Sequence, residues 1–140
     1  MYSDDVNRAD FKKLALTRLD DAKVLLKKRR YSAAYYLAGY AVECALKACL
    51  AKKTRRFDFP PEPEQVKNVY YIHKLETLAR ASGLLQALQG TPKLYRYWTL
   101  VKNWSEASRY DPRAGKWARD VLLAIEDPTD GVLQCIKRYW

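Results

Sequence analysis

This sequence of 140 residues has very little of what metal-dependent and disulfide-bonded proteins need. It contains one histidine and three cysteines, and neither the paired Cys and His spacing of a zinc site nor an HExxH motif occurs. Its five glycines are scattered singly, so no glycine-rich loop is present to hold phosphates. We therefore expect no metal and no cofactor, and we interpret Cys44, Cys49 and Cys135 as small core residues.

Long hydrophobic runs are also missing. No stretch of about 18 apolar residues exists, so the sequence predicts no membrane-spanning helix and no membrane partner. The segment 1–5 carries acid where a secretory signal peptide would carry base followed by an apolar stretch. Together with the odd number of cysteines, these features predict a cytoplasmic protein.

Acidic residues are few relative to basic ones. The chain has 26 Lys and Arg against 16 Asp and Glu, a formal net charge of +10. Such a surplus favours polyanionic partners, RNA or nucleotides, through electrostatic steering and counterion release. The run 27–30 (Lys-Lys-Arg-Arg) has two interpretations that the sequence leaves open, a phosphate contact and a solvated helix end.

Apolar residues recur at three- and four-residue steps along most of the chain, which is the period of amphipathic helices. No alternating pattern typical of strands appears. The predicted helices cover 7–30, 32–52, 73–81, 84–89, 92–108 and 115–140, the last broken near 127–128. Three prolines interrupt the period in the loop of about 53–72. The sequence thus predicts an all-α protein, an up-and-down bundle of four to five helices forming one domain over residues 1–140.

The helix predicted over 32–52 is unusual in composition. Alanines succeed one another at steps of four and three residues, a seam that lets a second helix approach closely: Ala34, Ala38, Ala41, Ala45 and Ala48. A second stripe beside it carries tyrosines and an i,i+4 ion pair: Tyr36, Tyr40, Glu43 and Lys47. Because leucines flank this stripe, we expect it to be partly buried.

Four segments give the chain a family resemblance. Residues 18–25 lie within a first amphipathic helix, and residues 32–48 (SAAYYLAGYAVECALKA) come after a short turn. Residues 73–78 (HKLETL) and 104–112 (WSEASRYDP) come later. This sequence resembles the HEPN (higher eukaryotes and prokaryotes nucleotide-binding) domain over about residues 8 to 138. The segment 32–48 is moderately specific for that family, and the others are weaker.

The resemblance implies a HEPN-like helical bundle, usually a homodimer, often paired with a nucleotidyltransferase or acting in toxin–antitoxin and defence systems. Many members of the family are metal-independent ribonucleases that use an Arg and a His separated by four to six residues. Here the only histidine, His73, precedes Arg109 by 36 positions, and the positions after Arg109 that would hold the histidine are Ala114, Gly115 and Lys116. The ribonuclease motif is therefore absent from this sequence.

Arg109 and His73 are the candidate catalytic residues, and each has two interpretations. Arg109 would either pair with a partly buried Glu43 or present its guanidinium to a ligand. His73 would either bond to backbone or a neighbouring carboxylate, or transfer protons in RNA cleavage. The predicted ligand-binding residues are Arg109, Glu43, Lys47, Tyr36 and Tyr40.

The aromatic residues also have two interpretations, core packing on helical stripes and stacking of nucleic-acid bases. Base stacking has the most support in the loop 53–72, where aromatic and basic residues interleave: Phe57, Phe59, Tyr70 and Tyr71 beside Lys53, Arg55, Arg56 and Lys67. We expect a helical module that binds RNA, a nucleotide or a nucleotidyltransferase-like partner protein. A metal-independent endoribonuclease with a non-standard site is the alternative.

Overall fold

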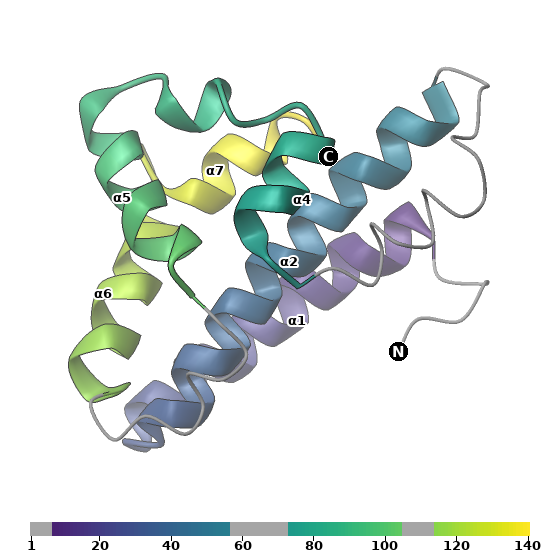
Figure 1. Cartoon of the computed structure of the whole chain (residues 1–140). Coiled ribbons are helices and arrows are strands. Elements are labelled where there is room, and N and C mark those ends of the chain that lie inside the picture. The colour runs from purple at the N-terminus through teal and green to yellow at the C-terminus, as the bar shows by residue number, and fades with distance from the viewer. Residues whose placement is uncertain (1–6, 57–72, 105–113) are drawn as a thin grey trace.

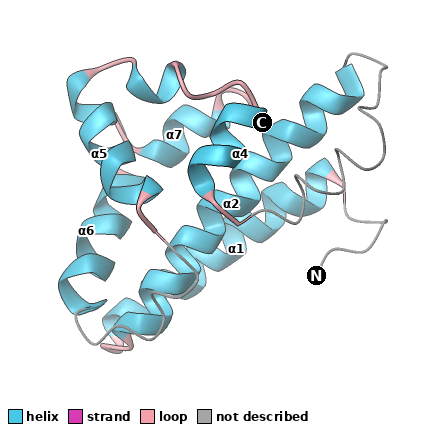
Figure 2. Ribbon diagram, viewed as in Figure 1, coloured by secondary structure: helices cyan, strands magenta, loops and turns pink. Residues whose placement is uncertain are grey.

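The fold of the chain was obtained as a computed structural model, which describes residues 7–56, 73–104 and 114–140. Every regular element in these ranges is helical (Figure 2), which confirms the all-α prediction. The six α-helices and one 3₁₀ helix are α1 (Arg8–Lys27), α2 (Tyr31–Arg56), α4 (Leu75–Ala81), η1 (Ala87–Gln89), α5 (Pro92–Lys102), α6 (Ala114–Glu126) and α7 (Val132–Lys137).

The long helices α1 and α2 form an antiparallel pair that runs diagonally through the molecule in Figure 1. Asn7 caps α1: its side chain accepts from the Asp10 backbone N–H, and the Asp10 carboxylate accepts from the Asn7 backbone N–H. The residues of α1 that are buried share one stripe at helical spacing: Phe11, Ala15, Leu19 and Ala22. All five alanines of the predicted seam on α2 are buried, so the seam is part of the core.

The shorter helices cover one side of this pair (Figure 1), with α5, α6 and α7 grouped together and α4 lying on α2. Thr91 caps α5 by accepting from the Leu94 backbone N–H at 3.1 Å, and Pro92 takes the first helical position as predicted. The break near 127–128 is also confirmed, because α6 ends at Glu126 and α7 begins at Val132.

Several predicted boundaries are wrong. The first helix ends at Lys27 and not at residue 30, because Arg29 takes a left-handed φ of 60° in the turn to α2. The second continues past residue 52 to Arg56, so the expected loop begins later, and its remainder lies outside the described residues. Residues 84–89 form only the 3₁₀ helix η1, and α5 ends at Lys102 and not at residue 108.

The chain directly after α5 approaches α2 closely at Gly39. Trp104, which is buried, lies against Gly39 so closely that a Cβ at position 39 would overlap its indole ring. The Trp104 Nε1–H donates to the backbone oxygen of Tyr35 at 3.1 Å. Position 39 therefore needs glycine, because only a residue without a Cβ leaves room for the Trp104 indole against α2.

The three cysteines are free and buried, as the sequence predicts. Burial raises the pKa of the Cys44 thiol to about 12 and that of Cys49 to about 12, because the interior disfavours a thiolate. Both thiols are thus held in the unreactive protonated form at neutral pH. Among the described helices, none has the length and apolar character needed to cross a membrane.

Candidate functional site

Three polar side chains from two parts of the chain meet at the middle of α2, and we name them the buried cluster: Glu43, Lys47 and His73. Glu43 and Lys47 have no solvent exposure, and Lys47 Nζ donates to Glu43 Oε2 at 3.2 Å. His73 Nδ1 lies 2.9 Å from Glu43 Oε1, and its side chain is 46% exposed. One carboxylate therefore contacts a buried ammonium group and an imidazole that reaches the surface.

Local structure explains why these groups meet. Glu43 and Lys47 are one helical turn apart, so they share a face of α2. His73 lies just before α4, which the buried Leu75 and Leu78 hold against the core. The expectation that the stripe on α2 is partly buried is confirmed. His73 contacts a neighbouring carboxylate, and its catalytic role stays a prediction.

Tyr36 and Tyr40 continue the stripe toward the start of α2. Their rings are stacked, with centroids 6.4 Å apart and an interplanar angle of 6°, and Tyr36 also lies 5.9 Å from the Trp104 ring. Both tyrosines are half-buried against the core. This packing agrees with the structural interpretation of the stripe.

Arg109, the other candidate catalytic residue, lies outside the described residues, so its expected pairing with Glu43 stays a prediction. The same holds for Phe57, Phe59, Tyr70 and Tyr71, the aromatic residues of the predicted loop.

Cationic side chains gather where α1 turns into α2 and where α6 begins, two segments that lie side by side at the lower left of Figure 1. We name this region the basic end; its six cations, all exposed, are Lys27, Lys28, Arg29, Arg30, Lys116 and Arg119. Tyr31 joins the two segments: the Arg119 guanidinium donates to its hydroxyl at 3.1 Å and lies 5.1 Å from its ring centroid.

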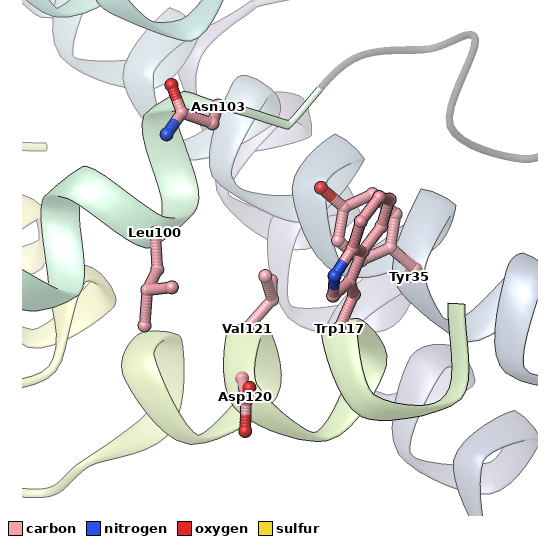
Figure 3. Close-up of a pocket in the computed structure, with 6 residues that line it drawn as sticks. All are labelled: Tyr35, Leu100, Asn103, Trp117, Asp120 and Val121. Atoms are coloured by element: carbon pink, nitrogen blue, oxygen red, sulfur yellow. The ribbon is translucent and has the colours of Figure 1, made fainter. Parts of the chain in front are cut away.

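A pocket of about 270 Å³ lies next to the basic end, between α2, α5 and α6 (Figure 3). The rings of Tyr35 and Trp117 form one wall, with centroids 6.0 Å apart and an interplanar angle of 46°. Leu100, Val121, Asn103 and Asp120 complete the lining. We name it the aromatic pocket.

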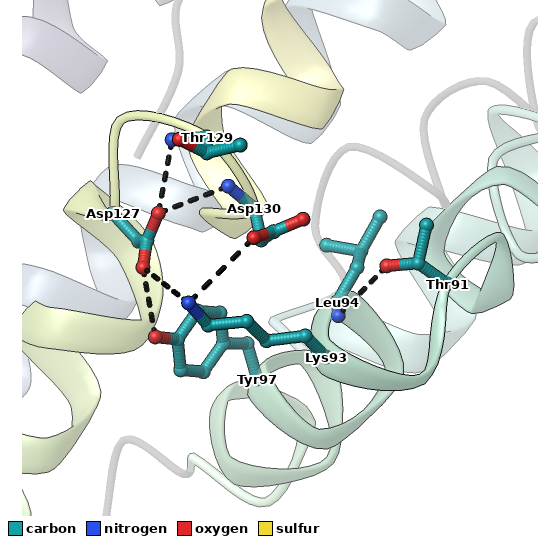
Figure 4. A network of polar contacts seen from close by, with 7 residues as sticks. All are labelled: Thr91, Lys93, Leu94, Tyr97, Asp127, Thr129 and Asp130. Carbon is teal, nitrogen blue, oxygen red and sulfur yellow. Dashed lines mark hydrogen bonds and ion pairs between the residues drawn. The ribbon is translucent and has the colours of Figure 1, made fainter.

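A second polar network fastens α5 to the turn between α6 and α7 (Figure 4). Asp127 accepts backbone N–H groups of Asp130 and Thr129 at 3.0 and 2.9 Å, and the Tyr97 hydroxyl at 2.9 Å. These hydrogen bonds, with Lys93 Nζ at 3.4 Å, hold the pKa of the Asp127 carboxyl well below its ordinary value. Because all of these partners satisfy Asp127 locally, we interpret the network as structural.

The class of protein is an all-α helical module. It is defined by the long antiparallel pair, the short helices on one side of that pair and the buried ion pair on α2. The match to a family model is more specific: the model described as HEPN domain matches residues 9–137, so this chain belongs to the HEPN family. Membership supports a nucleotide- or RNA-related helical module. No curated protein and no solved structure matches the chain significantly.

Sequence reasoning missed the aromatic pocket and the part of the basic end contributed by α6. Trp117, Asp120 and Val121 stand at i, i+3 and i+4, a spacing that puts them on one face of a helix. That spacing would have predicted a shared face, yet it would not have shown that Tyr35 and Asn103 meet it from two other parts of the chain.

Proposed function

We propose that this chain binds RNA through the basic end. The observation that carries the proposal is that six exposed cations gather there, while none of them forms an ion pair with an acidic residue in the described part of the chain. Elsewhere the described cations include Lys23, which pairs with Glu126 at 2.8 Å, and Lys93, which pairs with Asp127. Cations gathered without acidic partners favour a polyanion, because each phosphate contact releases a condensed counterion.

The helix geometry adds to this positive potential. α2 and α6 both begin at the basic end, so the partial positive charge of two helix N-termini lies beside the six cations. The net charge of +10 acts in the same direction over a longer range.

A salt titration of RNA binding tests the proposal. We expect a single-stranded RNA oligonucleotide to bind the full chain with an affinity that falls linearly with salt concentration on logarithmic axes. Replacing three cations at once (Lys27→Gln, Lys28→Gln and Arg30→Gln) should lower the magnitude of the slope by about 2, since each phosphate contact on a single strand contributes about 0.7. Fluorescence anisotropy of a labelled RNA gives both quantities.

Lys13→Gln is the matched control. Lys13 is exposed on the same helix but stands 14 residues before Lys27, which corresponds to about 21 Å along α1. We expect this variant to keep the slope of the unmodified chain. RNA binding that does not weaken as salt rises, or an equal loss with Lys13→Gln, would contradict the proposal.

An endoribonuclease is the second candidate, and the contact between His73 and Glu43 favours it. A carboxylate that contacts Nδ1 at 2.9 Å orients the imidazole, as in sites that use histidine for general acid–base catalysis. The half-exposed side chain of His73 is open to a substrate on at least one side. Against this candidate stands the absence of the Arg and His motif from the sequence.

Incubation of the full chain with RNA in EDTA separates the two candidates. Cleavage that is lost in His73→Asn while the variant stays folded would establish the enzyme. RNA that is bound and left intact supports the binding module. Five other expectations stay predictions: a homodimer, a nucleotidyltransferase partner, a role in a toxin–antitoxin or defence system, a single domain and a cytoplasmic location.

A further inference from the structure

The aromatic pocket has the size and the lining of a site for one ring system. Its volume of about 270 Å³ lies just below the roughly 300–1,000 Å³ of pockets that take drug-sized ligands. Leu100 on its rim is 45% exposed and Asn103 is exposed, so the pocket opens to solvent. Figure 3 shows that its side chains come from three separate parts of the chain, which fixes the shape of the opening.

The walls of the pocket suit a planar aromatic ligand. The half-buried Trp117 indole offers a ring surface, the buried Tyr35 phenol packs against it, and the apolar side chains of Leu100 and Val121 line the rest of the interior. Stacking on aromatic side chains is the main way in which proteins hold single unpaired bases. Trp104 keeps this wall in place, because its indole N–H donates to the backbone oxygen of Tyr35.

The polar groups of the lining distinguish among the bases. Asp120 offers two carboxylate oxygens that only accept, and Asn103 offers an amide that both donates and accepts. Guanine presents two adjacent donors, N1–H and N2–H, to a carboxylate and has acceptors at O6 and N7 for an amide. Adenine places the N1 acceptor where guanine has a donor, so a carboxylate would repel it. Uracil has only one ring donor.

The carboxylate of Asp120 is also available for such a contact. No ion pair joins it to any basic side chain in the described ranges, although Arg119 is its neighbour in sequence and binds Tyr31 instead. A ligand with neutral N–H donors would form hydrogen bonds with this carboxylate without adding a further positive charge to a basic region.

The basic end supplies the place for the rest of a nucleotide. Lys116 and Arg119 flank Trp117 on α6, and Tyr31 precedes Tyr35 by one turn of α2. A base in the pocket would therefore leave its sugar and phosphates next to the cations of the basic end.

We infer that the aromatic pocket binds a single guanine base, stacked on Trp117, which Tyr35 supports from the core side, and read by Asp120 and Asn103. The inference rests on the proposed RNA binding and names the base that this binding selects. The guanine comes from a single-stranded RNA or from a free guanine nucleotide, and the two sources share the same contacts in the pocket.

Two RNA pentamers that differ in one base, UUGUU and UUAUU, provide the test with the full chain. We expect UUGUU to bind about tenfold or more tightly, the discrimination typical of a two-point base contact. Asp120→Asn should bring the two affinities to within about twofold, and Asp20→Asn, on the exposed face of α1, should leave the preference unchanged. Guanosine monophosphate and adenosine monophosphate form the second arm of the test. Tighter binding of guanosine monophosphate would show that the site also takes free nucleotides. A guanine preference seen only with the pentamers would assign the site to RNA.

Tryptophan fluorescence adds a readout of the site itself. A stacked guanine should quench the emission of Trp117, and Trp117→Phe should remove that quenching while keeping a ring for stacking. Equal affinities for the two pentamers in the unmodified chain, or an unchanged preference in Asp120→Asn, would overturn the guanine site and leave salt-dependent RNA binding intact. Absence of any salt-dependent RNA binding would instead overturn the proposed function.

Discussion

Along the single helix α2, two regions carry charge in opposite ways. In the middle, Glu43 and Lys47 are excluded from water and bonded to each other, and the carboxylate also contacts His73. In the turn just before its start, Arg29 and Arg30 are exposed and have no acidic partner among the described residues. Removing one member of a buried pair leaves a charge in the interior, whereas removing an exposed cation costs little stability.

The largest effect on stability is therefore expected at the buried cluster. Glu43→Met should lower the free energy of unfolding by about 3–5 kcal/mol, because Lys47 loses its carboxylate in the interior. Urea denaturation measures this, and Glu76→Met is the control, since the Glu76–Arg80 pair is exposed and should contribute less than about 1 kcal/mol.

The double variant Glu43→Met with Lys47→Met sharpens the interpretation. If the uncompensated charge is the cause of the loss, removing both charges should cost less than Glu43→Met alone. A double variant that is less stable than the single one would show that packing, and not charge, dominates at this position.

The two regions also differ in how far the sequence predicts them. The i,i+4 spacing of Glu43 and Lys47 predicts a shared face, and the flanking leucines predict its burial. The contact with His73 spans 30 positions and depends on where α4 packs, which no local pattern encodes. The all-α fold itself was predictable, because apolar periodicity is a local property.

Helix ends were predicted less well than helices. The first helix ends early because Arg29 adopts a left-handed conformation. Residues other than glycine, asparagine and aspartate rarely adopt it, so the sequence does not predict it at an arginine. The aromatic pocket was missed for a different reason: its lining comes from separate parts of the chain, so it exists only once α5 and α6 are placed on α2.

Gly39 stands between the two regions on α2 and gives the next largest effect. Gly39→Ala should destabilise the chain by about 1–3 kcal/mol, because a Cβ there would overlap the Trp104 indole. Without that overlap the same change would stabilise a helix by about 0.5–1 kcal/mol. In a Trp104→Ala background, Gly39→Ala should therefore be neutral or stabilising, and additive losses in this double-mutant cycle would contradict the proposed overlap.

Asp127 is a third kind of charged group, because backbone N–H groups hold it more than its cation, Lys93, does. Its folded pKa lies below the ordinary 3.8, so the unfolded chain takes up the proton first as pH falls. The stabilisation by Asp127 is thus complete well above pH 3.8 and is lost as pH falls below that value toward the folded pKa. We expect Asp127→Asn to lower Tm at neutral pH and the difference from the unmodified chain to shrink in acid. A difference that persists unchanged in strong acid would contradict this origin.

At the basic end, the smallest effect on stability should accompany a measurable effect on binding. Arg119→Gln removes an exposed cation–π contact with Tyr31, which contributes about 0.5–1 kcal/mol. The same change removes a cation next to the aromatic pocket, so RNA affinity should fall and its salt dependence should weaken by the share of one phosphate contact. Arg119→Lys keeps the charge and should retain most of the salt dependence, because counterion release depends on charge more than on the guanidinium shape. If Arg119→Gln instead destabilised the fold as strongly as Glu43→Met, the exposed cations would be part of the structural framework, and the division of α2 into a stabilising middle and a binding end would be wrong.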